Sequence, residues 1–197
     1  MEQASLNSRP AIFFDRDNTL IVNDGYLSNP EHVHLIPGAA DAVARAHELG
    51  YAVVIASNQS GVARGFFTEE SVRQVNQRMD QLLLQANPRA IIDRHEYCPF
   101  HPEGTIERYR QSSNLCKPRP GMLLRAAALL NLDLKKSWMI GDSPRDIEAG
   151  KAAGCRTILL RLGDVKPSPA AIQESRVQPV ATAGSLSEAM EIIARGQ

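Results

Sequence analysis

The sequence predicts one α/β domain over residues 1–197, built as a three-layer, doubly wound parallel sheet of the Rossmann type. Short apolar runs of strand length alternate along the chain with amphipathic stretches of helical length. Several of these runs end in polar residues, as at Asp15, Ser57 and Asp142, and the carboxyl ends of strands are where open parallel sheets bind ligands. A chain of 197 residues is long enough for one well-filled core and too short for two.

The first predicted strand, 11–14, ends in two carboxylates, Asp15 and Asp17. Side chains two residues apart in an extended chain point to the same side, so we expect Arg16 to point away from both. Carboxylates held this close repel each other unless a cation lies between them, and Mg²⁺ binds to carboxylates, waters and phosphate oxygens. The pair therefore indicates a phosphate-handling metal site. The alternative is a polar turn that ends the strand.

The other elements follow from periodicity and from turn residues. A loop rich in Asn, Gly and Pro over 21–37 precedes a helix over 38–49, a buried strand over 51–56, and a helix that Thr68 caps and that ends near Ala86. The remaining expected elements are a strand over 90–97, a loop over 98–120, a helix over 122–130, strands over 137–140 and 157–160, a short helix over 147–153, a surface segment over 164–184 and a final helix over 186–194.

Composition narrows the function class. Lys plus Arg and Asp plus Glu number 22 each, which gives no basic excess for nucleic acid. The polar start of the chain, with residues 1–9 expected to be flexible, lacks the apolar core of a signal peptide, and no apolar run is long enough to span a bilayer. Three cysteines do not form an even-numbered disulfide framework, which favours a reducing compartment. We expect a cytoplasmic monomer that binds a small molecule and neither nucleic acid nor membrane.

Four motifs occur in an order that resembles the haloacid dehalogenase superfamily of phosphotransferases. They are Asp15-Arg16-Asp17-Asn18-Thr19, then Ser57 at a strand end, then Lys117, then Gly141-Asp142-Ser143-Pro144-Arg145-Asp146. Within the superfamily, the sequence is most similar to the branch of heptose-1,7-bisphosphate 7-phosphatases and the related histidinol-phosphate phosphatases. The segments that carry this similarity are 23–26, 57–65, Cys98-Pro99-Phe100-His101-Pro102 and Lys117-Pro118-Arg119-Pro120-Gly121-Met122.

The resemblance implies a mechanism and an order of substrates. Asp15 is the expected nucleophile, which forms an aspartyl-phosphate, and Asp17 the expected acid and base. Ser57 and Lys117 are expected to hold the phosphoryl group. The implied Mg²⁺ ligands are Asp15, the backbone carbonyl of Asp17 and Asp142, while Asp146 orients Lys117 or a metal-bound water. The first implied substrate is D-glycero-D-manno-heptose 1,7-bisphosphate, cleaved at its 7-phosphate, and the second is histidinol phosphate.

The gaps between motifs leave no room for an inserted cap domain, so we expect an open site whose selectivity comes from loops. A substrate-specificity loop is expected over 98–116. The expected substrate-binding residues are Thr19, Asn23, Asp24, Gly25, Tyr26, Asn58, Gln59, Ser60, Arg64, Cys116 and Ser143.

Three positions depart from the branch pattern. Asn18 replaces a usual Gly, which is tolerable if its φ is negative. Cys116 replaces a frequent Arg. Many members bind zinc in the 98–116 loop, but the corresponding positions here are Cys98, Phe100, Ser113 and Leu115, so structural zinc is not expected. A shifted ligand set of Cys98, His101, Cys116 and His95 stays open.

Two other classes also place acidic residues at strand ends. A receiver domain accepts phosphate on an aspartate but lacks the Asp-x-Asp-x-Thr motif, which is present here. A catalytically silent phosphate-binding protein is expected to have lost a member of the catalytic set, and none is missing. Mg²⁺-dependent release of phosphate from an aryl phosphate separates an enzyme from both.

Overall fold

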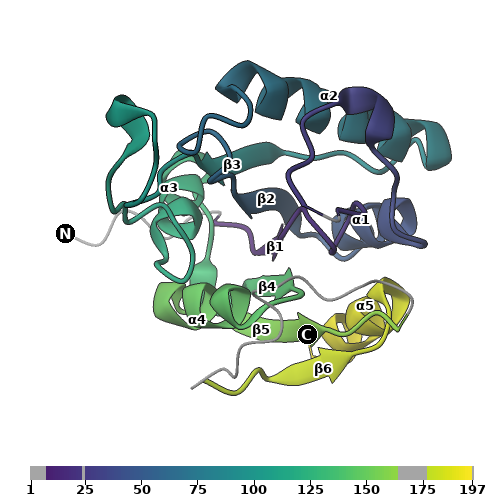
Figure 1. Cartoon of the computed structure of the whole chain (residues 1–197). Coiled ribbons are helices and arrows are strands. Elements are labelled where there is room, and N and C mark those ends of the chain that lie inside the picture. The colour runs from purple at the N-terminus through teal and green to yellow at the C-terminus, as the bar shows by residue number, and fades with distance from the viewer. Residues whose placement is uncertain (1–7, 24, 164–176, 197) are drawn as a thin grey trace.

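The computed structural model describes residues 8–23, 25–163 and 177–196, and they form one sheet with helices on both faces (Figure 1). The sheet has six parallel strands in the order β3-β2-β1-β4-β5-β6. The strands are β1 (Ala11–Phe14), β2 (Ala52–Asn58), β3 (Arg94–Cys98), β4 (Trp138–Gly141), β5 (Arg156–Leu160) and β6 (Ala181–Ala183). The helices are α1 (Ala39–Glu48), α2 (Glu69–Ala86), α3 (Gly121–Leu130), α4 (Pro144–Ala153) and α5 (Leu186–Arg195). The predicted doubly wound α/β fold is confirmed.

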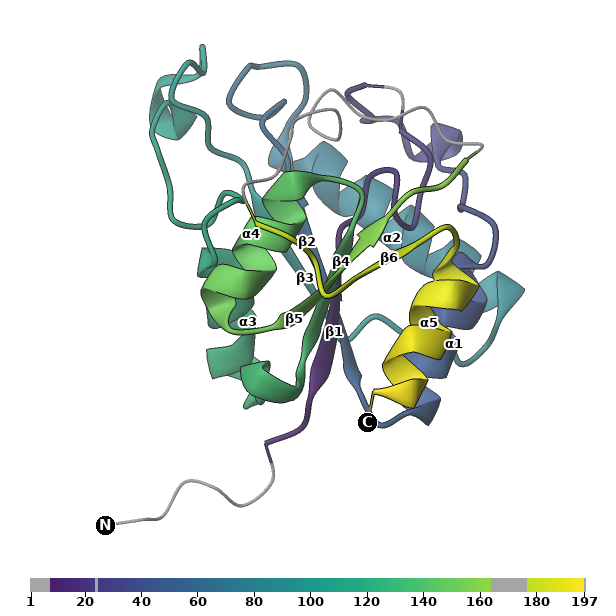
Figure 2. The same cartoon turned by 90° about the horizontal axis from the view of Figure 1, so that it is seen from below.

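Alternation along the strands divides the core into two layers. Ile12 and Phe14 of β1 pack with α1, α2 and α5, whereas Ala11 and Phe13 face the layer that contains α3. Figure 2 shows α3 and α4 on one side of the sheet and α1 and α5 on the other. Because β1 is buried on both faces, its residues are apolar throughout, which is the pattern of a central parallel strand.

Side-chain caps begin several of the helices. The Thr68 hydroxyl accepts the N–H of Ser71 at the start of α2, and the Ser185 hydroxyl does the same for Glu188 in α5. The residues that cap the start of α4 also belong to the polar cluster described below. There the Ser143 side chain accepts the N–H of Arg145, and Asp146 accepts the backbone N–H of Ser143.

Some element boundaries differ from those expected. β2 extends to Asn58, and α4 begins at Pro144 because Ser143 caps it. β3 begins only at Arg94, since the chain turns after α2 through a bond from the Ala90 N–H to the Asn87 carbonyl. Residues 181–183 were expected in a surface segment, but they form β6 along the open edge of β5. Residues 164–176 of that segment lie outside the described residues.

The start of the chain was expected to be flexible over 1–9. Residues 1–7 lie outside the described residues. Arg9, by contrast, forms a bridge with Leu132 and a salt bridge of 2.9 Å with Asp93. None of the described helices has the length and apolarity needed to cross a membrane.

Candidate active site

The strand order places the polar strand ends beside one another. β1 lies between β2 and β4. The chain runs from β1 through β2 to β3 on one side of the sheet, and from β4 through β5 to β6 on the other side. Crevices form at such switch points because neighbouring loops diverge. Phe14 is in register with Ile55 and Ile140, and the Asp15 N–H continues the ladder to the Ile140 carbonyl at 2.9 Å. This register places Asp15 beside Ala56 on one side and Gly141 on the other, one residue before Ser57 and Asp142.

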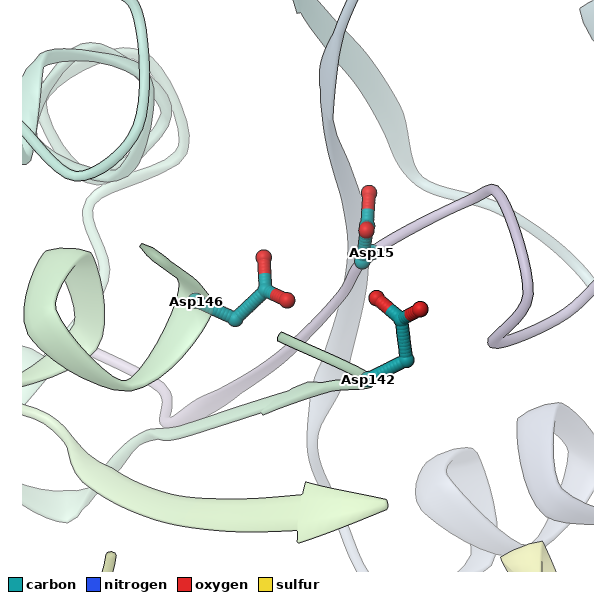
Figure 3. Close-up of side chains that lie close together, drawn as sticks. All are labelled: Asp15, Asp142 and Asp146. Atoms are coloured by element: carbon teal, nitrogen blue, oxygen red, sulfur yellow. The ribbon is translucent and has the colours of Figure 1, made fainter. Parts of the chain in front are cut away.

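Three aspartates gather at this point. Asp15, Asp142 and Asp146 each offer a carboxylate oxygen, and these oxygens lie within 4.8 Å of one another. Figure 3 shows the carboxylates of Asp142 and Asp146 directed toward the space beside Asp15. Gly141 makes this approach possible, because a Cβ at that position would overlap the Asp146 carboxyl group. A larger residue there would displace Asp146.

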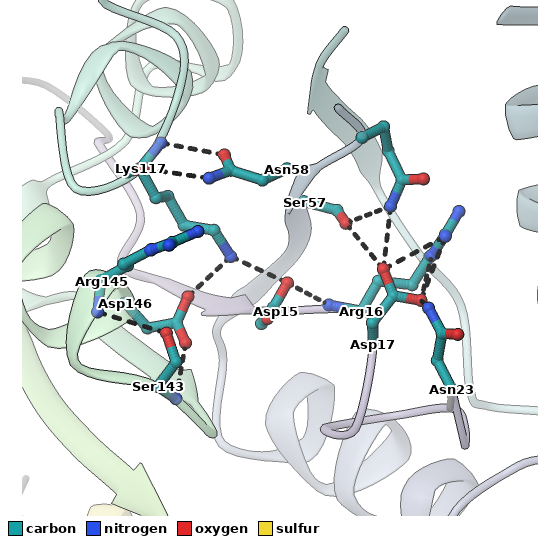
Figure 4. A network of polar contacts seen from close by, with 11 residues as sticks. Asp15, Arg16, Asp17, Asn23, Ser57, Asn58, Lys117, Ser143, Arg145 and Asp146 are labelled. Atoms are coloured by element: carbon teal, nitrogen blue, oxygen red, sulfur yellow. Dashed lines mark hydrogen bonds and ion pairs between the residues drawn. The ribbon is translucent and has the colours of Figure 1, made fainter. Parts of the chain in front are cut away.

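Lys117 reaches this cluster from the loop that precedes α3. Its Nζ lies 2.8 Å from Asp15 Oδ1 and 2.6 Å from Asp146 Oδ1, with only 3% of the side chain exposed (Figure 4). The Asn58 side chain holds the lysine backbone by two bonds, accepting its N–H and donating to its carbonyl, each at 2.9 Å. Asn58 of β2 thus fixes the backbone of Lys117, and Asp146 fixes its ammonium group.

The charges of the four groups do not balance. Burial would lower the pKa of Lys117, but attraction to Asp146 and Asp15 outweighs it, so the pKa lies above its usual range. Burial raises the pKa of Asp15 well above its ordinary value, and although Lys117 lowers it, Asp146, Asp142 and Asp17 raise it further. Three ionised carboxylates and one ammonium leave two negative charges. A divalent cation would compensate them, and oxygen donors are the ligands that Mg²⁺ prefers.

Asp17 has a separate set of partners on the other side of Asp15. Its carboxylate accepts bonds from Asn23 Nδ2 at 2.9 Å, Gln59 Nε2 at 2.8 Å and Ser57 Oγ at 3.3 Å. Arg16 also binds it, through Nε and Nη2. The expectation that Arg16 points away was wrong, because its long side chain turns back toward the Asp17 carboxylate (Figure 4).

The turn after Asp17 explains how Asn18 is accommodated. Its φ is +56°, so the condition of a negative φ is not met. Asn adopts this left-handed region more readily than most residues. Its Oδ1 also accepts the N–H of Asn23 at 2.8 Å. The side chain therefore ties the motif to the loop that carries Asn23.

The other expected substrate-binding residues fall into three groups. Tyr26, 50% exposed, packs edge-on against Phe66 with centroids 4.6 Å apart, so it lies at the surface. Thr19 and Ser143 are buried, and Ser143 serves as the cap of α4. The third group, Gly25, Ser60 and Arg64, makes no hydrogen bond or ion pair with Asp15 among the described residues, and Asp24 lies outside those residues. Arg64 Nη2 contacts His101 Nε2 at 3.1 Å, which joins two of the loops expected to select substrate.

The 98–116 loop is held at both ends and in its middle. Cys98 and Cys116 form a disulfide with a Cα–Cα distance of 5.1 Å, although three cysteines had indicated no framework. The pairing is not visible in the sequence because it depends on the loop returning to the end of β3. In the middle, the hydroxyl of Tyr109 donates to Glu69 in the first turn of α2, and Tyr97 of β3 donates to the same carboxylate. Those two bonds lower the pKa of Glu69.

The Cys98–Cys116 disulfide involves two of the four residues of the shifted zinc ligand set, which was Cys98, His101, Cys116 and His95. Both of its cysteines are bonded to each other, and His95 Nε2 contacts Asp80 at 2.9 Å. Among residues 8–23, 25–163 and 177–196, the grouping suited to a metal is the aspartate cluster. The absence of structural zinc stays a prediction.

We expect less than one zinc per chain by elemental analysis, and no change in melting temperature on chelation. A reductant should lower the melting temperature, since the bridge closes a loop of sequence separation 18, and closing a loop of this size stabilises by about 3 kcal/mol. The double variant Cys98→Ser/Cys116→Ser should lose the response to reductant, whereas Cys155→Ser, at a buried free cysteine, should keep it. Stoichiometric zinc would contradict this account.

Sequence reasoning missed Arg16, Asn76 and Glu69 as groups that organise the site. Arg16 stood inside the first motif, but its direction was inferred from strand alternation, and β1 already ends at Phe14. Asn76 is a buried polar residue on the apolar face of α2, and that break in the pattern was the available signal. No pattern marked Glu69, which stands among the ordinary acidic residues of a helix start.

Comparison with known proteins gives a consistent set of relatives. A family model described as HAD-hydrolase-like matches residues 114–189. D-glycero-beta-D-manno-heptose-1,7-bisphosphate 7-phosphatase of Salmonella typhi is 42% identical over 157 residues, which is 79% of this chain and 82% of the relative. The protein of the same name from Rhodopseudomonas palustris is 45% identical over 152 residues, 77% of this chain and 83% of its own length.

Solved structures agree with the sequence relatives. A HAD-like phosphatase from Mesorhizobium loti has a TM-score of 0.80 and 34% identity, and the match covers 95% of this chain and 85% of that one. The D,D-heptose 1,7-bisphosphate phosphatase of B. bronchiseptica, solved with magnesium and phosphate, has a TM-score of 0.79 and 26% identity. That match covers 95% of this chain and 99% of that one.

Proposed function

Because the chain belongs to the haloacid dehalogenase superfamily and is a phosphatase, we propose that it removes the 7-phosphate of D-glycero-D-manno-heptose 1,7-bisphosphate. The reaction depends on Mg²⁺ and passes through an aspartyl-phosphate on Asp15. The observation that carries the proposal is the Asp15–Lys117–Asp146 chain of ion pairs beside Asp142, in a chain whose relatives bear that enzyme name. The enzyme acts in the cytoplasm as a monomer.

Asp15 is suited to attack phosphorus. Its Oδ1 accepts the N–H of Arg16 at 2.7 Å and lies 2.8 Å from Lys117 Nζ, so one oxygen is fixed. Its Oδ2 has no hydrogen bond among the described residues and remains for nucleophilic attack. Magnesium, held by Asp15, Asp142 and the backbone carbonyl of Asp17, would keep the nucleophile ionised and offset the charge of the phosphate.

Lys117 and Ser57 bind the phosphoryl group in this mechanism. Lys117 contacts the nucleophile directly, so its ammonium lies where phosphoryl oxygens must approach. The Ser57 hydroxyl accepts a bond from Gln59 Nε2 at 2.7 Å, which orients it between Asp17 and the phosphate. Asp17 protonates the leaving sugar oxygen and then removes a proton from the water that cleaves the aspartyl-phosphate.

Loops supply the selectivity for the sugar. The described part of the chain has no domain inserted between the motifs, so the loops that carry Tyr26, Arg64 and His101 border an open site. The Arg64 guanidinium is the group best suited to a second phosphate, since a planar guanidinium binds phosphate oxygens in pairs. A bisphosphate therefore fits this arrangement better than a monophosphate.

The test is phosphate release from a substrate panel at fixed Mg²⁺. The panel contains the 1,7-bisphosphates of both heptose anomers, fructose 1,6-bisphosphate, histidinol phosphate and 4-nitrophenyl phosphate. We expect kcat/KM to be highest for a heptose bisphosphate. A higher value for histidinol phosphate would overturn the substrate while leaving the phosphatase chemistry in place.

Metal dependence gives a separate prediction. Asp142→Ala removes one of the three clustered carboxylates, so the Mg²⁺ concentration needed for half-maximal activity should rise about 10- to 100-fold, as for other disturbed metal sites. A Mg²⁺ titration of activity measures this, with Asp133→Ala, which lies in the turn before β4, as control. An unchanged titration in Asp142→Ala would remove Asp142 from the ligand set.

A further inference from the structure

Arg16 is a buried charge that the mechanism above does not use. It lies between the nucleophile and the acid/base in sequence, and only 1% of its side chain is exposed. Nε lies 3.2 Å from Asp17 Oδ1, and Nη2 lies 3.1 Å from Oδ1 and 3.2 Å from Oδ2. Its remaining terminal nitrogen, Nη1, donates to Asn76 Oδ1 of α2 at 3.0 Å. The guanidinium is thus fixed on two sides.

We propose that Arg16, anchored by Asn76, is a positioning residue that aims the Asp17 carboxylate at the leaving-group oxygen. This inference rests on the proposed role of Asp17 as acid and base. It assigns no contact between Arg16 and the substrate. The effect of Arg16 on the reaction passes through the orientation of Asp17.

The geometry distinguishes Arg16 from the other partners of Asp17. Asn23 contacts Oδ1 only, and Gln59 and Ser57 contact Oδ2 only. Among these partners in the described chain, Arg16 alone contacts both oxygens. A contact to one oxygen leaves the carboxylate free to rotate about its last bond, whereas a guanidinium that contacts both oxygens restricts that rotation. Proton transfer to a leaving group requires this control, because a general acid must lie within hydrogen-bond reach of its target.

Asn76 explains why the guanidinium itself does not move. It is buried on α2, a helix that packs through Val75, Met79 and Leu83 into the core on one face of the sheet. The hydrogen bond from Arg16 Nη1 to Asn76 therefore fixes the orientation of the guanidinium relative to α2, which is a rigid element. A lysine at this position would keep the charge but could not contact Asn76 and both Asp17 oxygens in one plane.

The arrangement also leaves a position for the transferred proton. The bond from Ser57 Oγ to Asp17 Oδ2 is the longest contact in the set at 3.3 Å. When a phosphoryl group enters, the Ser57 hydroxyl and the Gln59 amide that is bonded to it can both turn toward it. Arg16 then remains as the donor to Oδ2, and one lone pair of that oxygen is freed for the proton. The contacts from Arg16 can persist through this change, so the carboxylate keeps its direction while it exchanges a proton with the leaving oxygen.

The test compares leaving groups, because loss of acid catalysis slows poor leaving groups more than good ones. kcat and KM are measured for an alkyl phosphate, the sugar phosphate preferred in the panel, and for 4-nitrophenyl phosphate. Arg16→Gln should lower kcat for the alkyl ester by roughly 10- to 100-fold more than for the aryl ester. This is less than the roughly 10²- to 10⁴-fold that a general acid contributes, because Arg16 acts only through Asp17. KM should change much less than kcat, and Arg16→Lys should recover only part of the loss.

Asn76→Ala gives a second route if Arg16→Gln does not fold. It leaves the contacts between Arg16 and Asp17 but removes the anchor, so it should show a smaller selective loss of the same kind. Arg125→Gln is the matched control, since it breaks an arginine–carboxylate pair with buried Glu96 between α3 and β3, away from the site. It should leave the ratio of alkyl to aryl rates unchanged. Equal losses on both esters in Arg16→Gln and Asn76→Ala would overturn the inference.

A parallel variant separates this inference from the proposed function. Asp17→Asn should show the same leaving-group dependence more strongly. If Asp17→Asn shows it and both Arg16→Gln and Asn76→Ala do not, the role of Arg16 is wrong and that of Asp17 stands. If Asp17→Asn affects both esters equally, the assignment of Asp17 as general acid is wrong, and the role of Arg16 falls with it.

Discussion

Asp15→Asn is expected to abolish turnover. The amide cannot attack phosphorus as a carboxylate does, and the substitution keeps the shape of the side chain, so the loss is chemical. The variant should also lose the ability to form a trifluoroberyllate adduct, which mimics the aspartyl-phosphate. Two measurements check this: phosphate release under saturating substrate, and fluorine NMR of the protein mixed with beryllium and fluoride.

The control for this variant is Asp41→Asn, at an exposed carboxylate in the first turn of α1. It should retain activity and form the adduct. The melting temperature of Asp15→Asn should be equal to or higher than that of the unmodified protein, because burial disfavours the ionised form of Asp15. Substantial turnover in well-folded Asp15→Asn would exclude Asp15 as the nucleophile.

The pKa of Asp15 also predicts how metal binding depends on pH. Since the pKa is raised, mainly by burial, the protonated form of Asp15 persists to higher pH than for an ordinary carboxyl group. Its contribution to the stability of the metal-free protein is present at low pH and is lost as the pH rises through the raised pKa. Mg²⁺ requires the ionised form, so stabilisation by Mg²⁺ should increase over the same pH range.

Strand and helix positions could be predicted from the sequence because each core element carries its own pattern. β1 and β4 are apolar on both faces, and Thr68 marks the start of α2 as a capping residue does. β6 could not be predicted in this way. Its three residues, Ala181–Ala183, carry no strand pattern, and they are extended because β5 offers an unpaired edge. That information lies in the sheet and not in the segment.

The same distinction applies to the site. The order of the motifs indicated the cluster of Asp15, Lys117 and Asp142, because parallel strands bring their carboxyl ends together wherever they lie in the sequence. The direction of a long side chain beyond a strand end follows no such rule. Arg16 and the Cys98–Cys116 bridge both depend on which loop returns to which strand, so tertiary contacts decide them.

Lys117→Met should impair both catalysis and stability. The variant removes the ammonium that contacts Asp15 and Asp146, two carboxylates that remain buried with no compensating charge from that side. Breaking a buried ion pair by removing one partner costs about 3–5 kcal/mol of folding free energy. For catalysis, kcat should fall and KM should rise together, because a charge-assisted contact to phosphate serves both the bound substrate and the transition state.

The loss of stability in Lys117→Met should depend on pH in a defined direction. In the unmodified protein the raised pKa of Lys117 keeps the ammonium charged, and its contribution to stability is lost only at pH values above the ordinary lysine range. Without it, the pKa of Asp15 should rise further, since Lys117 is the group that lowers it. The melting temperature of Lys117→Met should therefore fall more steeply than that of the unmodified protein as the pH rises above the ordinary carboxyl range.

Added Mg²⁺ completes the test of Lys117. A divalent cation among Asp15, Asp142 and Asp146 would offset part of the charge that the variant leaves behind, so Mg²⁺ should raise the melting temperature of Lys117→Met more at pH 8 than at pH 5.5. Lys136→Met, at an exposed lysine 3.8 Å from Asp133, is the control and should match the unmodified protein in both respects. If Lys117→Met were equally stable at both pH values, with or without Mg²⁺, the lysine would not be the counter-charge that holds the aspartates together. Its position between Asp15 and Asp146 makes the opposite result the expected one, because no other cation of the described chain forms an ion pair with either carboxylate.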